Sequence, residues 1–428
     1  MTTETVQRKL MVSQMAETLI ASEIIKLAGE INEKIKNGEQ IYNLTIGDFD
    51  PKIFSIPKEL EDEIIKAYRE KETNYPPANG ILELRKVVSK FLLDREGLSY
   101  TPNEILTAAG ARPLIYATYQ TVVQPGDTVI FPVPSWNNNH YSHLSHAKKV
   151  EILATPENNF MPTAEDMRPY VKDAALISLC SPLNPTGTVF SYKQLEDICN
   201  LIIEENDRRS PNEKPLYLMY DQIYWVLTFG DTEHFNPVSI NPEMRNYTIF
   251  IDGLSKAFAA TGVRVGWSFG PERVIDKMKS ILSHLGAWAP KAEQVATARY
   301  LSNAGLVDSF LAEYKDKVHK RLEGFYEGFM ALKKEGYKVN AIAPQAAIYL
   351  TVQFELHGMK KADDGSVLET TRDITKYLLE EAHVAIVPFH AFGDSADSSW
   401  YRLSVGTCRL EEVEKVIESL RNALAKLS

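Results

Sequence analysis

Apolar, β-rich runs alternate with helical stretches through the middle of this 428-residue chain, and this alternation constrains the fold more than any other feature. Strands that alternate with helices predict a largely parallel sheet that carries helices on both faces. In such sheets ligands gather at the carboxyl ends of the strands, so residues that directly follow a strand are candidates for a functional site. Helices are expected at 114–123 and 192–205, and strands at 105–108, 128–131, 174–179, 216–220, 247–251 and 265–269.

The two ends of the chain show different patterns. Apolar residues such as Leu19 and Leu27 recur at helical spacing over residues 14–38, which predicts one amphipathic helix there. Residues 272–335 are mostly helical by pattern, and the tail 337–428 predicts strand, helix, strand, strand and helix. The chain is too long for one ordinary hydrophobic core, so the tail is expected to form a second, α+β domain.

Composition excludes several classes of protein. An apolar content of 44% is typical of a globular enzyme, and a net charge of −10 argues against a nucleic-acid partner. No apolar run approaches the ~20 residues that a membrane helix needs, and residues 1–20 resemble neither a secretory signal nor a transit peptide. Cys180, Cys199 and Cys408 fall in no metal or redox spacing, which favours a reduced, cytoplasmic compartment.

A lysine lies beside a serine just after the predicted strand 247–251. The amine of Lys256 can form an imine with an aldehyde cofactor, and once released it can carry a proton. The hydroxyl of Ser255 and the guanidinium of Arg264 can hold an anionic group of the same cofactor. A lone serine–lysine pair is more often a surface feature, so this interpretation depends on the motifs that accompany it.

Polar side chains also follow two other predicted strands. Asp221 comes directly after 216–220, and a carboxylate that leaves a buried strand needs a cationic or hydrogen-bonding partner. Capping of the next helix is the alternative role for Asp221. Asn184, in the run 181–187, and Tyr224 can each donate a hydrogen bond to an ionised oxygen. The Asn-Pro-Thr-Gly sequence is a turn signal in any protein, but here it follows a strand that is expected to be buried.

The segment Ala109-Gly110-Ala111-Arg112-Pro113 lies between a predicted strand and a predicted helix. Pro113 is expected at the first helical position, where its missing N–H costs nothing. Backbone N–H groups at a helix N-terminus bind anions, so the segment is a candidate phosphate site. A simple helix start explains the same pattern equally well.

Together the runs 181–187, 220–224 and 252–267 resemble the motifs of the pyridoxal 5′-phosphate (PLP) aminotransferases of class I/II and fold type I. The resemblance extends from Leu44 to Gly406. It implies an α/β fold, in which a large domain has a mostly parallel sheet sandwiched by helices and a smaller α+β domain is built from both chain termini.

The resemblance also implies domain boundaries and an activity. The discontinuous small domain would comprise 1–58 and 305–428, and the large PLP-binding domain would comprise 59–304. The implied enzyme is a transferase that moves an amino group between an α-amino acid and a 2-oxoacid. Its small-molecule partners would be those amino acids and 2-oxoacids.

Roles for individual residues follow from the resemblance. Lys256 would carry PLP as an imine and shuttle a proton, and Asp221 would keep the ring nitrogen of PLP protonated. Tyr224 and Asn184 would bond to the phenolate oxygen of PLP, and Trp136 would stack on its ring. The phosphate would be held by Ala111, Arg112, Ser255 and Arg264, together with Tyr75 contributed across a subunit boundary, which implies a homodimer with shared active sites.

Substrate would be recognised by a second group of residues. Arg402 would grip the α-carboxylate, because its rigid fork suits a carboxylate better than a lysine would. Asn184 and the backbone of Gly47 would lie beside the same group. Arg112 is the candidate for a second, distal carboxylate, so glutamate and 2-oxoglutarate are expected as one couple of an aspartate aminotransferase-like enzyme.

Arg112 has a rival interpretation. It would only support the phosphate, and Phe389, Trp288 and Trp400 would form an apolar pocket for aromatic substrates. The chain also departs from the family at the expected substrate mouth, since Ala346-Ala347-Ile348-Tyr349 stands where the family often has Gly-Ala-Phe-Tyr. The physiological substrate pair therefore stays open at this point.

Two other functions use the same cofactor residues. A PLP-dependent lyase, such as a carbon–sulfur β-lyase, differs only in the fate of the carbanion. A non-catalytic PLP sensor of a transcription regulator would need a basic DNA-binding module ahead of Leu44, and the residues there are too few. His140, His143 and His146 recur at spacing three, but no nearby carboxylate or cysteine completes a metal site, and none is expected.

Overall fold

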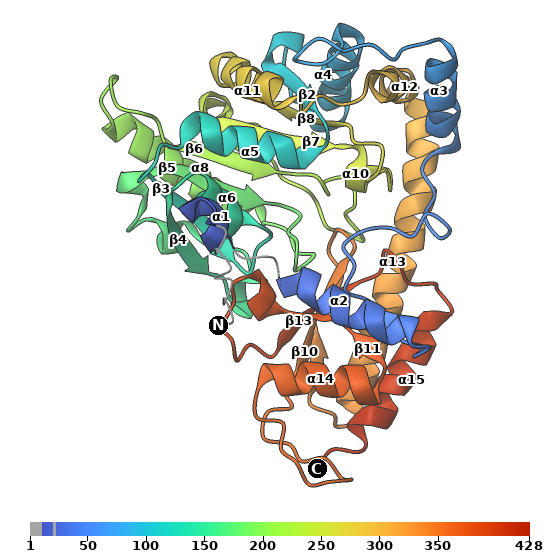
Figure 1. The fold of residues 1–428 in the computed structure, drawn as a ribbon. Coiled ribbons are helices and arrows are strands. Elements are labelled where there is room, and N and C mark those ends of the chain that lie inside the picture. The colour runs from blue at the N-terminus through green and yellow to red at the C-terminus, as the bar shows by residue number, and fades with distance from the viewer. Residues whose placement is uncertain (1–10, 20–22) are drawn as a thin grey trace, which may run out of the picture.

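The computed structural model describes residues 11–19 and 23–428. Within these residues a seven-stranded sheet runs in the order β2-β8-β7-β6-β5-β3-β4 (Figure 1). Neighbouring strands are parallel except β8, which is antiparallel to β2 and β7. This sheet confirms the predicted α/β class, and it adds β4 to the expected strands. The strands are β2 (Ile105–Ala108), β3 (Thr128–Val133), β4 (Lys148–Leu153), β5 (Ala174–Cys180), β6 (Tyr217–Asp221), β7 (Thr248–Gly253) and β8 (Gly266–Phe269).

Helices cover both faces of this sheet. On one face α5 and α11 share an apolar cluster with Met219 and Ile249, and on the other α4 and α8 share one with Leu218 and Phe250. Successive side chains of a strand point to opposite faces, so strands buried on both faces are apolar at nearly every position. The helices are α3 (Lys58–Arg69), α4 (Leu82–Glu96), α5 (Ala111–Val122), α6 (Asn138–Leu144), α7 (Ala164–Met167), α8 (Tyr192–Arg208), α9 (Pro237–Ile240), α10 (Leu254–Ala257), α11 (Glu272–Leu285) and α12 (Lys291–Leu301).

A smaller antiparallel sheet, in the order β12-β13-β10-β9, lies in a second layer of the molecule (Figure 1). The tail has more strands than predicted, because β11 and β12 are two residues each and leave little pattern. The division at 58/59 and 304/305 stays a prediction. The elements are α13 (Ala304–Lys334), β9 (Val339–Ala341), β10 (Tyr349–Phe354), α14 (Thr371–Glu381), β11 (Val384–Ala385), β12 (Val387–Pro388), β13 (Trp400–Ser404) and α15 (Glu412–Leu424). None of the described helices, the long α13 included, combines the length and the apolar character that crossing a bilayer requires.

The two ends of the chain meet in this smaller part. Strand β1 (Tyr42–Asn43) pairs in parallel with β11. Leu44 then joins two C-terminal segments, because its N–H donates to the Ala385 carbonyl at 2.9 Å and its own carbonyl accepts from the Ser404 N–H at 2.9 Å. These two hydrogen bonds therefore hold the N-terminal segment against C-terminal segments of the chain.

The single helix predicted over 14–38 is wrong. The structure has α1 (Gln14–Thr18) and α2 (Glu23–Lys36), and Leu19 has extended backbone angles after α1. In α2, Ile31 is fully buried against Leu379 and Ala385, as its spacing predicts. The carbonyl of Met15 in α1 lies 3.1 Å from His143 Nε2 of α6, so α1 packs elsewhere. Continuous helical periodicity cannot reveal a break that such tertiary contacts impose.

Candidate active site

A cavity of about 680 Å³ opens where the carboxyl ends of β5 and β6 approach the N-terminus of α5. It is lined by every predicted site residue except Tyr75. Residues of the smaller sheet also reach it, because Tyr349 of β10 and Arg402 of β13 lie on its wall. The cavity therefore collects polar side chains from both layers of the molecule, as expected for a site at the carboxyl edge of a parallel sheet.

Lys256 lies in α10, directly after β7. Its Nζ donates to the Gly47 carbonyl at 2.6 Å, and its own carbonyl accepts from the Tyr314 hydroxyl at 2.9 Å. Burial lowers the pKa of the Lys256 amine to about 8, against the charge of Asp48, which raises it. An amine with this pKa is unprotonated more often at neutral pH than an exposed lysine, so it is better suited to act as a base or nucleophile.

Asp221 is the last residue of β6 and faces the cavity. One carboxylate oxygen accepts from the Ile223 N–H at 3.1 Å. Burial raises the pKa of the Asp221 carboxyl to about 6, and that one backbone hydrogen bond opposes the shift. No cation among the described residues forms an ion pair with it. A protonated ring nitrogen is a cation of the kind that this buried carboxylate lacks, so the group fits PLP.

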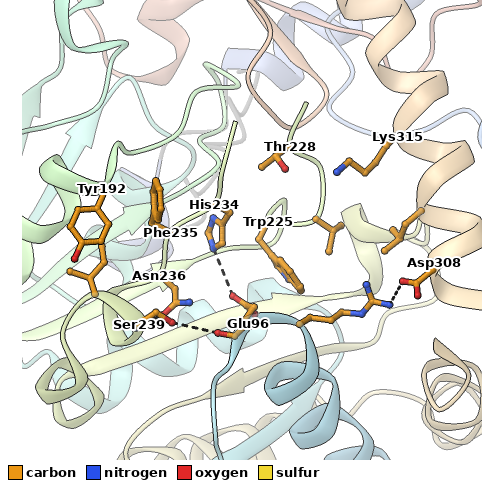
Figure 2. Close-up of a pocket in the computed structure, with 14 residues that line it drawn as sticks. Glu96, Tyr192, Trp225, Thr228, His234, Phe235, Asn236, Ser239, Asp308 and Lys315 are labelled. Atoms are coloured by element: carbon orange, nitrogen blue, oxygen red, sulfur yellow. Dashed lines mark hydrogen bonds and ion pairs between the residues drawn. The ribbon is translucent and has the colours of Figure 1, made fainter. Parts of the chain in front are cut away.

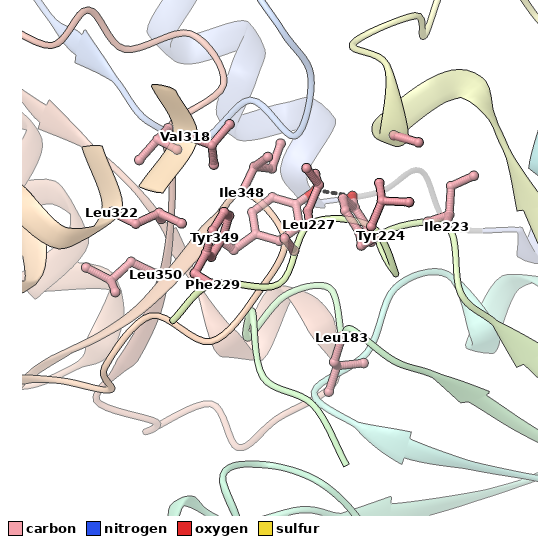
Figure 3. Close-up of a cluster of buried hydrophobic side chains, with 14 of the residues drawn as sticks. Leu183, Ile223, Tyr224, Leu227, Phe229, Val318, Leu322, Ile348, Tyr349 and Leu350 are labelled. Carbon is pink, nitrogen blue, oxygen red and sulfur yellow. Dashed lines mark hydrogen bonds between the residues drawn. The ribbon is translucent and has the colours of Figure 1, made fainter. Parts of the chain in front are cut away.

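The side chains of Tyr224 and Tyr349 link the large sheet to the smaller sheet, on the wall of the cavity that Asp221 also lines. Their hydroxyls lie 2.6 Å apart, within the buried cluster shown in Figure 3. Tyr224 follows β6 in sequence, whereas Tyr349 begins β10. Sequence reasoning gave Tyr349 no role, although it closes the segment Ala346-Ala347-Ile348-Tyr349. Tyr349 is a position at which this segment agrees with the Gly-Ala-Phe-Tyr of the family that the sequence resembles, and that agreement was the available signal.

Arg402 is 2% exposed, and its guanidinium is the most buried charge of the site. It donates to Asn184 Oδ1 at 3.0 Å and to the Thr45 carbonyl at 2.6 Å, and it lies 4.7 Å from the ring centre of Tyr349. Its Nε has no hydrogen-bond partner among the described residues. A buried guanidinium without a carboxylate partner and with a free N–H is suited to a carboxylate ligand.

Gly47 allows this close packing. A Cβ at this position would lie 2.9 Å from the Tyr349 hydroxyl and 3.5 Å from an Arg402 nitrogen. The backbone of residue 47 therefore lies against the same guanidinium, where the sequence analysis expected it.

The N-terminus of α5 and Arg264 lie together on the cavity wall and are suited to an anion. Arg264 donates to the carbonyls of Ala109 (2.9 Å) and Thr261 (2.7 Å), so it spans the loop before the helix. Gly110 has a φ of +86°, and a Cβ there would lie 2.8 Å from the Arg264 guanidinium carbon. The helix begins at Ala111, so Pro113 is not the first helical residue as predicted. Its lack of an N–H is harmless nonetheless, because the first four N–H groups of a helix have no internal partner. With the buried hydroxyl of Ser255, this arrangement fits a phosphate.

Arg112 and Trp136 form the outer wall. The Arg112 guanidinium lies 5.4 Å from the ring centre of Trp136, whose ring lies 6.4 Å from that of Phe392. Arg112 is exposed, and Trp136 is half-buried. This cation is thus on the solvent side of the cavity, whereas Arg402 is in its depth.

Four aromatic residues lie outside the cavity. Phe389 and Trp400 both pack against Phe160, with ring centres at 5.1 and 5.4 Å. Trp288 contacts Tyr75 at 5.1 Å, and Tyr75 is 82% exposed. Within one chain, none of Phe389, Trp288 and Trp400 lines the cavity, so the rival apolar pocket for aromatic substrates is not assembled there and stays a prediction. Within one chain Tyr75 does not reach the site.

The histidines at spacing three do not share a helix. α6 ends at Leu144, before His146, and His143 Nε2 contacts the Thr18 hydroxyl at 3.3 Å. Across the described residues no group of three histidine, cysteine or acidic side chains is arranged to hold a metal ion.

The sequence of the chain is similar to those of known proteins. The profile of the family described as "Aminotransferase class I and II" matches residues 39–420. An aspartate aminotransferase from Bacillus sp. (strain YM-2) is 30% identical over 415 residues, which are 96% of this chain and 98% of that protein. An aspartate/prephenate aminotransferase from Thermus thermophilus is 29% identical over 420 residues, which are 97% and 99% of the two chains.

Solved structures agree in fold. The aspartate aminotransferase of Rhizobium meliloti superposes with a TM-score of 0.89 at 26% identity, covering 98% of this chain and all of that chain. The aspartate aminotransferase of Thermus thermophilus with maleate gives 0.84 at 27% identity, covering 97% and 100%. Both likenesses span both layers described above.

Proposed function

Because this chain belongs to the class I and II aminotransferase family, it is a PLP-dependent enzyme that transfers an amino group between an amino acid and a 2-oxoacid, and we propose that glutamate and 2-oxoglutarate are one of its couples. The lyase alternative is not favoured, since the curated relatives reported above are named aminotransferases. The observation that carries the proposal is the pair of guanidiniums on one cavity, Arg402 in its depth and Arg112 at its outer wall. A dicarboxylate offers one carboxylate to each. The Thermus relative with bound maleate, itself a dicarboxylate, supports this choice.

We assign the cofactor-holding groups as follows. The N-terminus of α5, Ser255 and Arg264 would hold the phosphate, and Asp221 would pair with the ring nitrogen. Tyr224 and Asn184 would hydrogen-bond the phenolate oxygen, and Trp136 would lie on the ring face. When bound, PLP supplies a reactive aldehyde carbon and a ring that accepts the electrons left by a departing α-proton.

The remaining steps belong to side chains of the chain itself. Arg402 would fix the α-carboxylate, so that the α-hydrogen is directed at Lys256. The Lys256 amine, with its lowered pKa, would take that proton at Nζ and return it to the cofactor side. The Gly47 carbonyl, 2.6 Å from Nζ, would keep the amine near the carboxylate site. Burial of Arg402 and Asp221 excludes water, which strengthens both charge pairs.

Arg112→Ala should weaken dicarboxylate substrates selectively. Loss of one charge-assisted pair costs about 1.5–3 kcal/mol, or roughly ten- to a hundredfold in kcat/KM. We therefore expect this loss for aspartate and glutamate, and a much smaller one for alanine and phenylalanine, in steady-state assays with each donor.

Arg112→Lys is the matched control, because it keeps the charge and should recover part of the preference. Equal losses for all four donors would mean that Arg112 serves the phosphate, and the dicarboxylate preference would then have no residue to rest on.

We also propose a homodimer with shared sites. The ring of Tyr75 is exposed and contacts Trp288, which supports the idea that it acts on a neighbouring subunit. Mixed dimers provide the test. If Tyr75 acts across the boundary, co-refolding inactive Lys256→Ala with impaired Tyr75→Ala chains should restore roughly a quarter of wild-type activity, because each mixed dimer has one intact site.

Light scattering of the same samples gives the assembly size. An active monomer, or mixtures no more active than their components, would contradict the shared site. We also place the enzyme in the cytoplasm, and the three unpaired cysteines are consistent with a reducing compartment.

A further inference from the structure

Figure 2 shows a second cavity, of about 510 Å³. Its walls come from the end of α4, the segment that follows β6, and α13. It shares no lining residue with the active-site cavity.

Two buried polar side chains on its wall have atoms without a hydrogen-bond partner among the described residues. The side chains of Glu96 and His234 are 3% and 7% exposed, and they face each other in Figure 2. Their closest atoms, Oε2 and Nε2, are 3.9 Å apart, which is beyond hydrogen-bond range. Neither Glu96 Oε2 nor either ring nitrogen of His234 has a hydrogen-bond partner among the described residues. Buried polar atoms are normally paired, so this site is set up to receive a polar group.

A second buried acid, Asp252, lies near this pair. Glu96 Oε1 accepts from Gln222 Nε2 at 2.8 Å, and Trp225 Nε1 donates to the nearby carboxyl of Asp252 at 3.0 Å. Burial, and then the charge of Asp252, raise the pKa of Glu96 well above its usual range. Burial lowers the pKa of His234 to about 3, so the imidazole is neutral. The carboxyl groups thus lack a cation, and a ligand that brings one would let Glu96 ionise.

The walls favour the same kind of ligand. The rings of Trp225, Phe235 and Tyr192 line the cavity, and aromatic faces attract cations. On the other side of Trp225 in Figure 2, the half-buried ammonium of Lys315 makes no ion pair within the described chain. It offers a place for a carboxylate at the far end of a longer ligand.

We propose that this cavity is a second ligand site, in which Glu96 and His234 bind the protonated amine of a small molecule with an apolar body. The amine could belong to a simple arylalkylamine or to an amino acid whose carboxylate pairs with Lys315. Gln222, which hydrogen-bonds Glu96, directly follows Asp221 in the chain. The hydrogen bond from Gln222 to Glu96 thus begins one residue from the carboxylate that would hold the cofactor ring.

Calorimetric titration of the holoenzyme with N,N-dimethylphenethylamine tests the proposal. This tertiary amine is cationic at neutral pH and cannot form an imine with the cofactor, so it cannot become covalently attached in the active site. We expect one saturable site per chain. Glu96→Gln, which keeps the shape of the side chain and its hydrogen bond to Gln222, should weaken binding at least roughly tenfold.

Glu83→Gln is the matched control, because Glu83 is an exposed acid on the same helix. It should leave binding unchanged. His234→Phe provides a second variant, whose melting temperature shows whether it folds, and it should also weaken the probe. Absence of saturable binding, or binding that Glu96→Gln and His234→Phe leave intact, would overturn the proposal.

A second probe distinguishes the two sources of the amine. N,N-dimethyl-L-phenylalanine carries the same amine with a carboxylate. If it binds more tightly, and Lys315→Met but not the exposed Lys317→Met removes the gain, the site takes amino acids. If the carboxylate gives no gain, the site takes simple amines, and the role of Glu96 and His234 stands in either case.

Discussion

Replacing Lys256 by alanine should remove turnover. Lys256 is the only lysine that lines the active-site cavity among the described residues, and its Nζ lies 2.6 Å from the Gly47 carbonyl beside the carboxylate site. Loss of a positioned general base alone costs about 10²–10⁴-fold in rate. Loss of the covalent attachment of PLP adds to this, so we expect activity below roughly 10⁻⁴ of wild type in a steady-state assay.

The attachment point can be checked directly. Borohydride reduction of the wild-type holoenzyme, followed by peptide mass spectrometry, should locate the cofactor on Lys256. Lys277→Ala removes an exposed lysine and should leave activity intact. Finding the reduced cofactor on another lysine would contradict the assignment.

Asp221→Ala should lower kcat by several orders of magnitude. The carboxylate is buried at the end of β6 and has no ion pair within the described chain. It would therefore be the charged partner of the cofactor's ring nitrogen. Removal of one preorganised charge from a water-excluded site costs about 3–4 kcal/mol, or roughly 10²–10³-fold. The ring would also accept electrons less well without its proton, which deepens the loss.

Asp221→Asn separates charge from shape. It keeps the volume and the hydrogen bond from the Ile223 N–H, so a comparable loss would identify the charge as the cause. Asp207→Asn, an exposed acid of α8, should be silent. Turnover of Asp221→Ala within tenfold of wild type would exclude the proposed role.

The sequence predicted the centre of the large sheet better than its margin. β5, β6 and β7 are buried on both faces, so they leave continuous apolar runs that identify them. β4 is an edge strand with mostly exposed positions, and its charged side chains conceal it. No local pattern could show that β8 runs antiparallel, because direction depends on the connection and not on the strand.

The site residues that directly follow a strand in the sequence could be predicted. Ser255 and Lys256 follow β7, and Asp221 and Tyr224 follow β6, so strand ends alone place them at one edge. The contact of Arg402 with Asn184 joins residues 218 positions apart, and only the resemblance suggested it. The Glu96–His234 pair gave no sequence signal, since it depends on how the end of α4 packs against a loop after β6.

The pairing of β1 with β11 has a consequence for how the enzyme is made. All seven strands of the large sheet lie between residues 105 and 269, so the ribosome can deliver them, with Asp221 and Lys256, before β11 and β13 exist. The carbonyl of Thr45, by contrast, accepts a hydrogen bond from Arg402, which lies 357 positions later in the chain. Domains fold largely as units during synthesis. A nascent chain can thus bring Asp221 and Lys256 together while Arg402 is still untranslated, so the two sides of the cavity can be assembled at different times during synthesis.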